Sequence, residues 1–421
     1  MFLPDIKPAT AFVALALVFG VATVFITPPF QVPDEVGHFW HSYALARGEV
    51  FPNIVAGRAV VELPQGARDL VATLWIVPGT RTNFEQRLAS ASRIPYSSRK
   101  AAVKYPVLYS PVPYIPQAIG CFVGDALQLR PLVTFYIGRL ATLLAVVFLV
   151  VVAIRFAGEM GWIVCLVGAL PMSMFLFASY SADALTIALS LLVFACARDT
   201  PKTLYPAAFA LGLCKPPYLL ITLLVFARRR WRAAVTATAA AIAGGALAAF
   251  FACGSFSSMR PEADTAQQMR RLRDEPTVVL RVVTADLVDS SPEYLHQLVG
   301  RLGWLDIDVP RLAYYSVLAL LLLHLVYAGQ QRSAFDRLAA AGVFVACVGA
   351  IELSDFITWT PPAAAGIQGV QGRYFVPLLP LFFFALGRPA RVPRWLAYLT
   401  VFGEVIASGA GAYAVHQRYF G

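Results

Sequence analysis

Charged side chains are scarce in this sequence: Asp, Glu, Lys and Arg make up 14% of its 421 residues, whereas hydrophobic residues make up 58%. Soluble domains usually carry about 25% charged residues, so this chain is too poor in them to cover a soluble surface. Several apolar runs approach or exceed the roughly 18 to 20 residues needed to cross a bilayer. We therefore predict an all-α fold, a polytopic membrane helix bundle.

Three further absences narrow the class of protein. None of the six cysteines forms a C-x-x-C pair, so neither a zinc site nor a disulfide framework is indicated. No small-residue cleavage site follows the first apolar run, about 9–27; Pro28 and Pro29 follow instead, so we expect a retained helix. An internal repeat, which marks many secondary transporters, is also missing.

The basic residues define an expected topology. The formal charge is +10, but the arginines cluster in short loops between apolar runs, as the positive-inside rule predicts, so no nucleic-acid partner is expected. The pattern predicts a single transmembrane domain, 1–421, with about 11 spans, and CKPPY (214–218) is expected to break the apolar run 203–227. The predicted spans include 132–154, 162–180, 233–253, 338–353 and 395–414. Two long loops are expected outside: 28–130, which contains the amphipathic candidates 34–47 and 83–93, and 254–309.

Acidic and imidazole groups gather after the first apolar run, in PPFQVPDEVGHFWH, which places Asp34, Glu35, His38 and His41 within eight positions. One interpretation is a helix start, because proline and acidic residues favour a first turn. The other is a general base at the membrane surface, Asp34, held by Glu35 and His38. An E-x-x-H pair can also bind metal, but a second one is missing. A divalent metal is therefore an alternative, and we assign no metal ligand.

Asp183, in SYSADAL, lies between two apolar runs. It is either a helix cap together with Ser181 or a functional carboxylate at membrane depth. In GRLGWLDIDVP, Trp304 is either an interfacial anchor or a substrate contact. Asp306 is either a cap of the next helix or a substrate contact.

Three cations lie at outer membrane edges: Lys104 in KYP, Lys215 in CKPP and Arg373 in QGVQGRYF. Snorkelling to lipid headgroups explains any one of them. Three on one face indicate a site for an anionic lipid phosphate. Arg373, beside Tyr374, is the strongest candidate. A guanidinium binds phosphate through two parallel hydrogen bonds, and nearby glycines let the backbone approach a ligand closely.

Five motifs together carry a resemblance: PPFQVPDEVGHF, SYSADAL, CKPPYLL, GRLGWLDIDVP and QGVQGRYFVPLLPL. From about residue 25 to 387 the chain resembles a family of bacterial multispanning membrane proteins that is grouped by fold with the GT-C glycosyltransferases. The resemblance implies a GT-C-like bundle in the bacterial cytoplasmic (inner) membrane. By similarity Asp34 matches a catalytic base and Asp183 a second acidic site residue. Lys104 and Lys215 match phosphate-side lysines.

The sequence therefore favours an inverting membrane glycosyltransferase. It would move a sugar from a polyprenyl-phosphate donor to a glycan or lipid acceptor at the outer face of the membrane. A transporter or flippase of a lipid-linked or anionic solute is the first alternative, and a non-catalytic GT-C-like assembly protein is the second. The expected partners are the polyprenyl-phosphate-linked sugar, membrane lipid and the acceptor.

Overall fold

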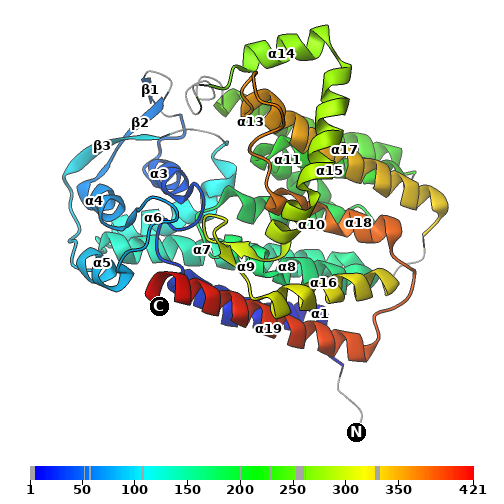
Figure 1. Cartoon of the computed structure of the whole chain (residues 1–421), viewed down its shortest axis with the longest axis horizontal. Helices are drawn as coiled ribbons and strands as arrows, with labels where there is room; N and C mark the ends of the chain where they lie inside the picture. Colours follow the sequence, from blue (N-terminus) through cyan, green and yellow to red (C-terminus); the bar gives the residue numbers. More distant parts are fainter. Residues whose placement is uncertain are drawn as a thin grey trace.

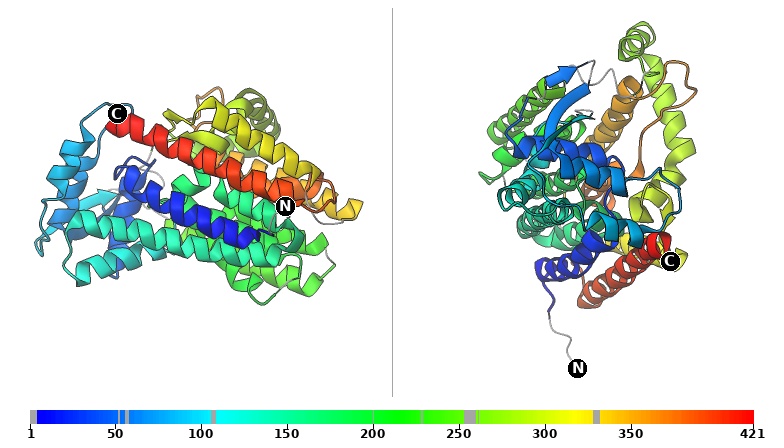
Figure 2. Two further views of the ribbon diagram at one scale, coloured as in Figure 1. Left: turned by 90° about the horizontal axis from the view of Figure 1, so that it is seen from below. Right: turned by 90° about the vertical axis from the view of Figure 1, so that its left-hand side faces the viewer.

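The computed structural model describes residues 5–51, 53–55, 58–105, 109–199, 201–227, 229–252, 260, 262–327 and 332–421. It is mostly helical, at 73%. The first helix is continuous through a π-helical turn and comprises α1 (Pro8–Leu15), η1 (Ala16–Gly20) and α2 (Val21–Ile26). Figures 1 and 2 show it beside the last helix, α19 (Arg394–Phe420), along the length of the bundle.

Five helical stretches among the described residues are long and apolar enough to cross a membrane, and a bent pair makes a sixth. Four of the five match spans predicted from sequence: Pro8–Ile26, α13 (Trp231–Ala252), α17 (Ala334–Thr358) and α19. Shorter apolar helices include α11 (Leu204–Cys214), α16 (Arg311–Val326) and the segment Gly372–Leu386, made of η6 (Gly372–Leu378) and α18 (Leu379–Leu386). A membrane protein with several apolar helices is thus confirmed, and the count of about 11 spans stays a prediction.

The remaining long stretch, 131–169, reverses direction at residues 158–160. Helix α7 (Pro131–Ala157) ends at Gly158, whose φ of 58° is a left-handed value that favours glycine. After a short 3-10 turn, α8 (Gly161–Ala169) runs back, and a Cβ added at Gly168 would lie 3.1 Å from the Val150 side chain. The two helices are therefore close antiparallel neighbours, as the separate spans predicted here require.

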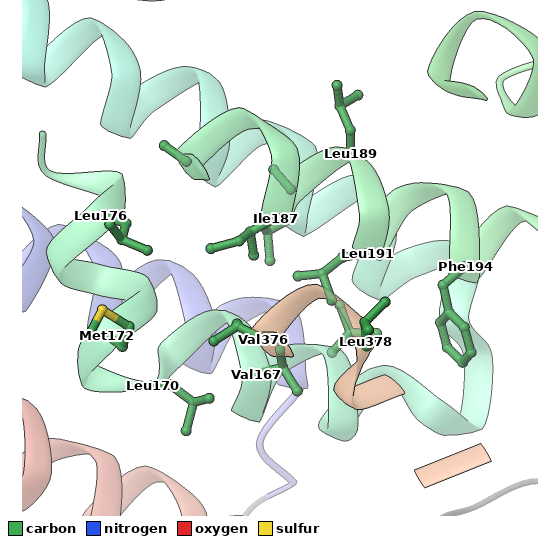
Figure 3. Close-up of a cluster of buried hydrophobic side chains, with 14 of the residues drawn as sticks. Val167, Leu170, Met172, Leu176, Ile187, Leu189, Leu191, Phe194, Val376 and Leu378 are labelled. Atoms are coloured by element: carbon green, nitrogen blue, oxygen red, sulfur yellow. The ribbon is translucent and has the colours of Figure 1, made fainter. Parts of the chain in front are cut away.

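The centre of the bundle is α10 (Ala182–Cys196), in which every residue is buried. It follows α9 (Pro171–Phe177) after a 119° bend. Figure 3 shows how α8, α9, α10 and η6 interdigitate. The labelled side chains there are Val167, Leu170, Met172, Leu176, Ile187, Leu189, Leu191, Phe194, Val376 and Leu378. Close packing of these side chains fixes the position of α10 in the bundle.

The predicted break at CKPPY is present. Helix α11 ends at Cys214, Lys215 is extended, and the chain continues as a 3-10 helix, η4 (Pro216–Leu223), and a last turn, α12 (Leu224–Ala227). Proline cannot continue an α-helix because it lacks the amide donor and clashes with the preceding turn. The sequence therefore places Lys215 at an irregular point inside an otherwise apolar segment.

The first long loop contains more order than the sequence predicts. Its helices are α3 (Glu35–Ala46), α4 (Gln65–Leu74), α5 (Phe84–Ala91) and α6 (Ile115–Ala126), with a 3-10 turn η2 (Val112–Tyr114). It also holds an antiparallel sheet of β1 (Asn53–Val55), β2 (Arg58–Pro64) and β3 (Lys100–Tyr105). In β2, Ala59, Val61 and Leu63 are buried with the period of two that a half-buried strand requires. An all-α fold is therefore corrected to a mostly helical fold with a small sheet.

The second long loop is described at residue 260 and over 262–309, whereas Cys253 lies outside the described residues. It forms α14 (Thr265–Asp274), the long helix α15 (Thr277–Gly300) and a short hairpin of β4 (Arg301–Leu302) and β5 (Ile307–Asp308). Gly372 packs against α15, because a Cβ there would lie 2.0 Å from the Tyr294 carbonyl oxygen. Its amide donates to Gln297 Oε1 at 2.7 Å. This contact positions η6 beneath α15.

One buried ion pair ties the first loop to the bundle. Arg139, in the first half of α7, binds Glu35 at the start of α3 with Nε–Oε1 at 2.9 Å and Nη2–Oε2 at 2.7 Å. Both side chains are 0% exposed. The same carboxylate accepts from the amides of Phe30, at 2.8 Å, and Tyr180, at 3.2 Å. Glu35 thus joins the loop, α7 and the bend before α10.

Arg139 uses its remaining donors on the end of the first helix. Its Nη1 donates to the carbonyl oxygens of Val24, at 3.0 Å, and Thr27, at 2.6 Å. Its Nη2 lies 3.3 Å from the carbonyl oxygen of Pro28. Helix ends leave carbonyl groups without partners, and a guanidinium with five donors supplies several at once.

Replacing Arg139 with Met is expected to destabilise the protein by about 3–5 kcal/mol, because a buried pair that loses one partner leaves the other charge uncompensated. Thermal unfolding in detergent should show a lower midpoint for Arg139→Met. The matched control is Arg155→Met on the exposed side of the same helix, which should leave the midpoint unchanged. Equal midpoints for the two variants would contradict the anchoring role.

Candidate functional site

A cavity of about 510 Å³ opens between the two long loops and the bundle. Its walls come from η4, the C-terminal ends of α13 and α17, the 359–374 segment and the first loop. Polar groups that line it include Asp34, Lys215, Asp355 and Gln371, and aromatic ones include Trp304 and Trp359. This size lies in the range of ligand-binding pockets, about 300–1,000 Å³.

Three of the predicted residues meet at the inner wall of this cavity. Lys215 Nζ donates to Asp183 Oδ1, and Arg373 Nε lies 3.2 Å from Asp183 Oδ2, an ion-pair distance without hydrogen-bond geometry. Asp183 stands in the first turn of α10, where Ser181 Oγ accepts from its amide at 3.1 Å. Ser181 is therefore the cap, and the Asp183 carboxylate is free to hold the two cations.

Aromatic rings surround the Lys215 ammonium. Its Nζ lies 4.5 Å from the centre of the Tyr374 ring and 5.1 Å from that of Tyr109. Tyr218 holds the first of these in place by donating to the Tyr374 carbonyl oxygen at 2.7 Å. Cation–π contacts of this kind stabilise a desolvated ammonium. Lys215 faces the cavity, whereas Arg373, at 5% exposure, lies behind it.

Asp34 faces the same cavity from the first loop. It takes a left-handed conformation, φ 62°, at the residue before α3, yet its side chain makes no cap hydrogen bond. Among the described residues no hydrogen bond or ion pair engages its exposed carboxylate. A positive φ is uncommon in residues other than glycine, and such strained backbone conformations cluster at functional sites. The helix-cap interpretation of Asp34 is thus replaced by a carboxylate available to a ligand.

The two histidines of the first loop are buried behind Asp34. His38 Nδ1 lies 2.8 Å from Tyr114 Oη, and His41 stacks on the Tyr114 ring at 4.3 Å between ring centres. Burial lowers the pKa of His38 to about 4 and that of His41 to about 3. Both imidazoles are therefore neutral near pH 7, and they pack the base of the loop that carries Asp34.

Other predicted site residues lie away from the cavity or at its edge. Glu35 is buried in the Arg139 network, where its carboxylate has no access to a ligand. Lys104 is exposed on β3 and is not part of the cavity wall. Asp306 accepts from the Trp304 amide at 2.9 Å and pairs with Arg418 of α19 at 3.3 Å. Trp304 itself lines the cavity.

Two charged residues that the structure places at or near the candidate site were not predicted from the sequence. Asp355, on α17, lines the cavity, and Arg139 anchors the loop. Each is a charged residue inside a long apolar run, a signal that marks functional or structural sites in membrane proteins. Within the described ranges no group of three or more His, Cys, Asp or Glu side chains is placed to hold a metal ion.

The fold and the apolar helices define a membrane protein with a ligand-sized cavity. Residues 17–382 match the model of a family described as "Predicted membrane protein (DUF2142)". The match covers most of the chain, which therefore belongs to this family, and the resemblance drawn from the sequence motifs is confirmed to that extent. A search of curated proteins and a search of solved structures found no significant match.

The buried histidines predict a pH dependence of stability. In the unfolded chain a histidine has a pKa near 6.5, above the folded values, so the unfolded state binds more protons as the pH falls below about 6.5. The free energy of unfolding should therefore fall by about 1.4 kcal/mol for each histidine between pH 7.5 and 5.5. Thermal unfolding across this window should show the loss.

His38→Gln should remove part of this pH dependence, because it deletes one of the buried imidazoles. The control is His416→Gln, since His416 is exposed near the end of α19. A pH dependence that persists in full in His38→Gln would show that His38 is not its source.

Proposed function

We propose that this protein is an inverting glycosyltransferase of the GT-C type in the bacterial cytoplasmic membrane. Its donor is a polyprenyl-phosphate-linked sugar, and its acceptor is a cell-envelope glycan or lipid at the outer face. The observation that carries the proposal is one cavity that joins a free carboxylate, Asp34, a caged ammonium, Lys215, and apolar walls. Transfer from a lipid-linked sugar phosphate requires these three parts: a base, a cation for the phosphate and an apolar surface for the lipid tail.

The charge at the inner wall suits such a donor. Lys215 and Arg373 carry two positive charges, and Asp183 carries one negative charge between them. One positive charge is left uncompensated, which matches the single negative charge of a phosphodiester. Because the triad is largely buried, its field is screened less than it would be in water.

Apolar residues supply the rest of a lipid site. Pro216, Pro217, Ala248 and Ala249 line the cavity where η4 faces α13. Burial of a prenyl chain there contributes about 0.8 kcal/mol for each CH₂ group removed from water. The cavity thus offers separate surfaces for a tail and for a charged head.

The chemistry follows from the positions of Asp34 and Lys215. The acceptor hydroxyl attacks the anomeric carbon and gives its proton to the Asp34 carboxylate. The bond between that carbon and the phosphate oxygen breaks, and its electron pair stays on the phosphate. Lys215, with Arg373 behind it, stabilises the charge that develops on the departing phosphate. A single displacement inverts the configuration at the anomeric carbon.

His38 and Glu35 support this step by holding Asp34 in place. His38 packs Tyr114 against the base of the loop, and Glu35 fixes the start of α3 through Arg139. A displacement of about 1 Å in a catalytic group can lower the rate on the order of a hundredfold, so rigid support matters. We assign both residues to positioning Asp34.

The first test compares polyprenyl phosphate binding to purified protein in nanodiscs. Lys215→Met should weaken binding about tenfold or more, because a buried phosphate loses a charged partner. Asp34→Asn should bind within twofold of wild type, since Asp34 contacts the acceptor. Lys100→Met on β3 is the control, because Lys100 is exposed and pairs only with Glu62, at 3.5 Å, among the described residues. Absence of binding to wild type would overturn the donor assignment.

The second test measures sugar transfer and separates the enzyme from its alternatives. Asp34→Asn should lower the transfer rate by a factor on the order of 100 to 10,000, as expected for loss of a general base. A variant that binds the lipid and retains full function in cells would contradict the enzyme. It would favour a transporter or flippase, or an assembly protein of the same fold.

A further inference from the structure

The α17 side of the cavity holds a carboxylate that the mechanism above does not use. Asp355 lines the cavity from the last turns of α17. Its backbone carbonyl accepts from the amides of Trp359, at 3.0 Å, and Thr360, at 2.9 Å. Among the described residues, no hydrogen bond or ion pair engages its side chain. A partly buried carboxylate without donors costs stability, so a ligand that supplies donors is the natural partner.

Neighbouring groups hold this carboxylate in a fixed place. Gly369 has a φ of 101°, and a Cβ added there would lie 2.4 Å from the Trp359 ring and 3.1 Å from Asp355 Oδ1. Only glycine permits this close approach. The 359–371 segment therefore folds back onto the end of α17 and keeps Asp355 and Trp359 side by side.

The side-chain amide of Gln371 is a second polar group of the same cavity. Gln371 lines the cavity, and its buried Oε1 has no hydrogen-bond partner among the described residues. Two tryptophans, Trp304 and Trp359, also line this cavity. The unpartnered Asp355 carboxylate, in a cavity with a polar amide side chain and aromatic rings, suits a sugar ring, whose hydroxyls donate hydrogen bonds and whose C–H faces pack on aromatic rings.

The adjoining part of the cavity, formed by η4 and α13, has a different character. There the Lys215 ammonium is already paired with Asp183 and suits a phosphate, and η4 and α13 are apolar. Groups suited to hydroxyls, to a phosphate and to an apolar tail thus line one cavity side by side. From the unpartnered carboxylate and the aromatic rings of this cavity we infer that Asp355, with Gln371 and the two tryptophans, forms the subsite that binds the sugar ring of the donor and sets its specificity. This inference rests on the proposed function.

The experiment compares lipid probes that differ only in the sugar. A short-chain polyprenyl phosphate is tested in nanodiscs beside the same lipid phosphate carrying glucose, mannose, galactose or arabinose. Wild type should bind at least one glycosylated probe about tenfold more tightly than the sugar-free lipid. In Asp355→Asn this preference should fall to about threefold or less, while the affinity for the sugar-free lipid stays within twofold of wild type.

Two controls keep a folding defect apart from a specificity defect. Because the Asp355 side chain has no partner to lose, Asp355→Asn should keep or raise the thermal unfolding midpoint of the protein. Asp289→Asn, on the exposed side of α15, should change neither the sugar preference nor the midpoint.

The outcomes distinguish this inference from the proposed function. If wild type binds the sugar-free lipid as tightly as every glycosylated probe, the sugar subsite is wrong and the lipid-phosphate site stands. The subsite is also wrong if Asp355→Asn weakens all probes by one common factor. If wild type binds neither the sugar-free nor any glycosylated lipid, the donor assignment falls and the subsite falls with it.

Discussion

The contact on which this structure depends is the fully buried pair of Glu35 and Arg139. Arginine in the middle of an apolar helix is costly unless every donor has a partner. Here the partners come from the Glu35 carboxylate and from three carbonyl oxygens at the end of the first helix and just beyond it. The pair therefore fixes where the chain leaves the first helix, and with it the position of Asp34.

The candidate site is also built on a buried carboxylate that pairs with cations, but there the charges are not fully compensated. Asp183 is nearly buried like Glu35, but it is shared between two cations, one of which reaches a cavity. A complete pair such as that of Glu35 serves structure, whereas the Asp183 cluster retains a net charge that a ligand can use. Asp34 and Asp355 complete the contrast, because their carboxylates face the cavity without partners among the described residues.

Sequence patterns located much of this arrangement. The proline break at Lys215, the cap at Ser181 before Asp183 and the glycines before Arg373 each follow from local chemistry, and each is present. The sequence did not predict which of the cations faces the cavity. Arg373 was the favoured phosphate ligand, yet Lys215 faces the cavity and Arg373 stands behind it. Which of two neighbouring cations is exposed depends on how η6 packs under α15, a contact between distant segments.

The sequence by itself determined the membrane class, the position of the long apolar helices and the gathering of acidic and basic residues after particular spans. Hydropathy and helix-breaking residues act locally, so a linear pattern carries that information. Only the tertiary structure decided that Glu35 is a buried anchor, that Lys104 and Asp306 lie away from the cavity and that Asp355 lines it. Those roles depend on which segments pack against one another, and burial and charge pairing across the chain are settled only when the helices assemble.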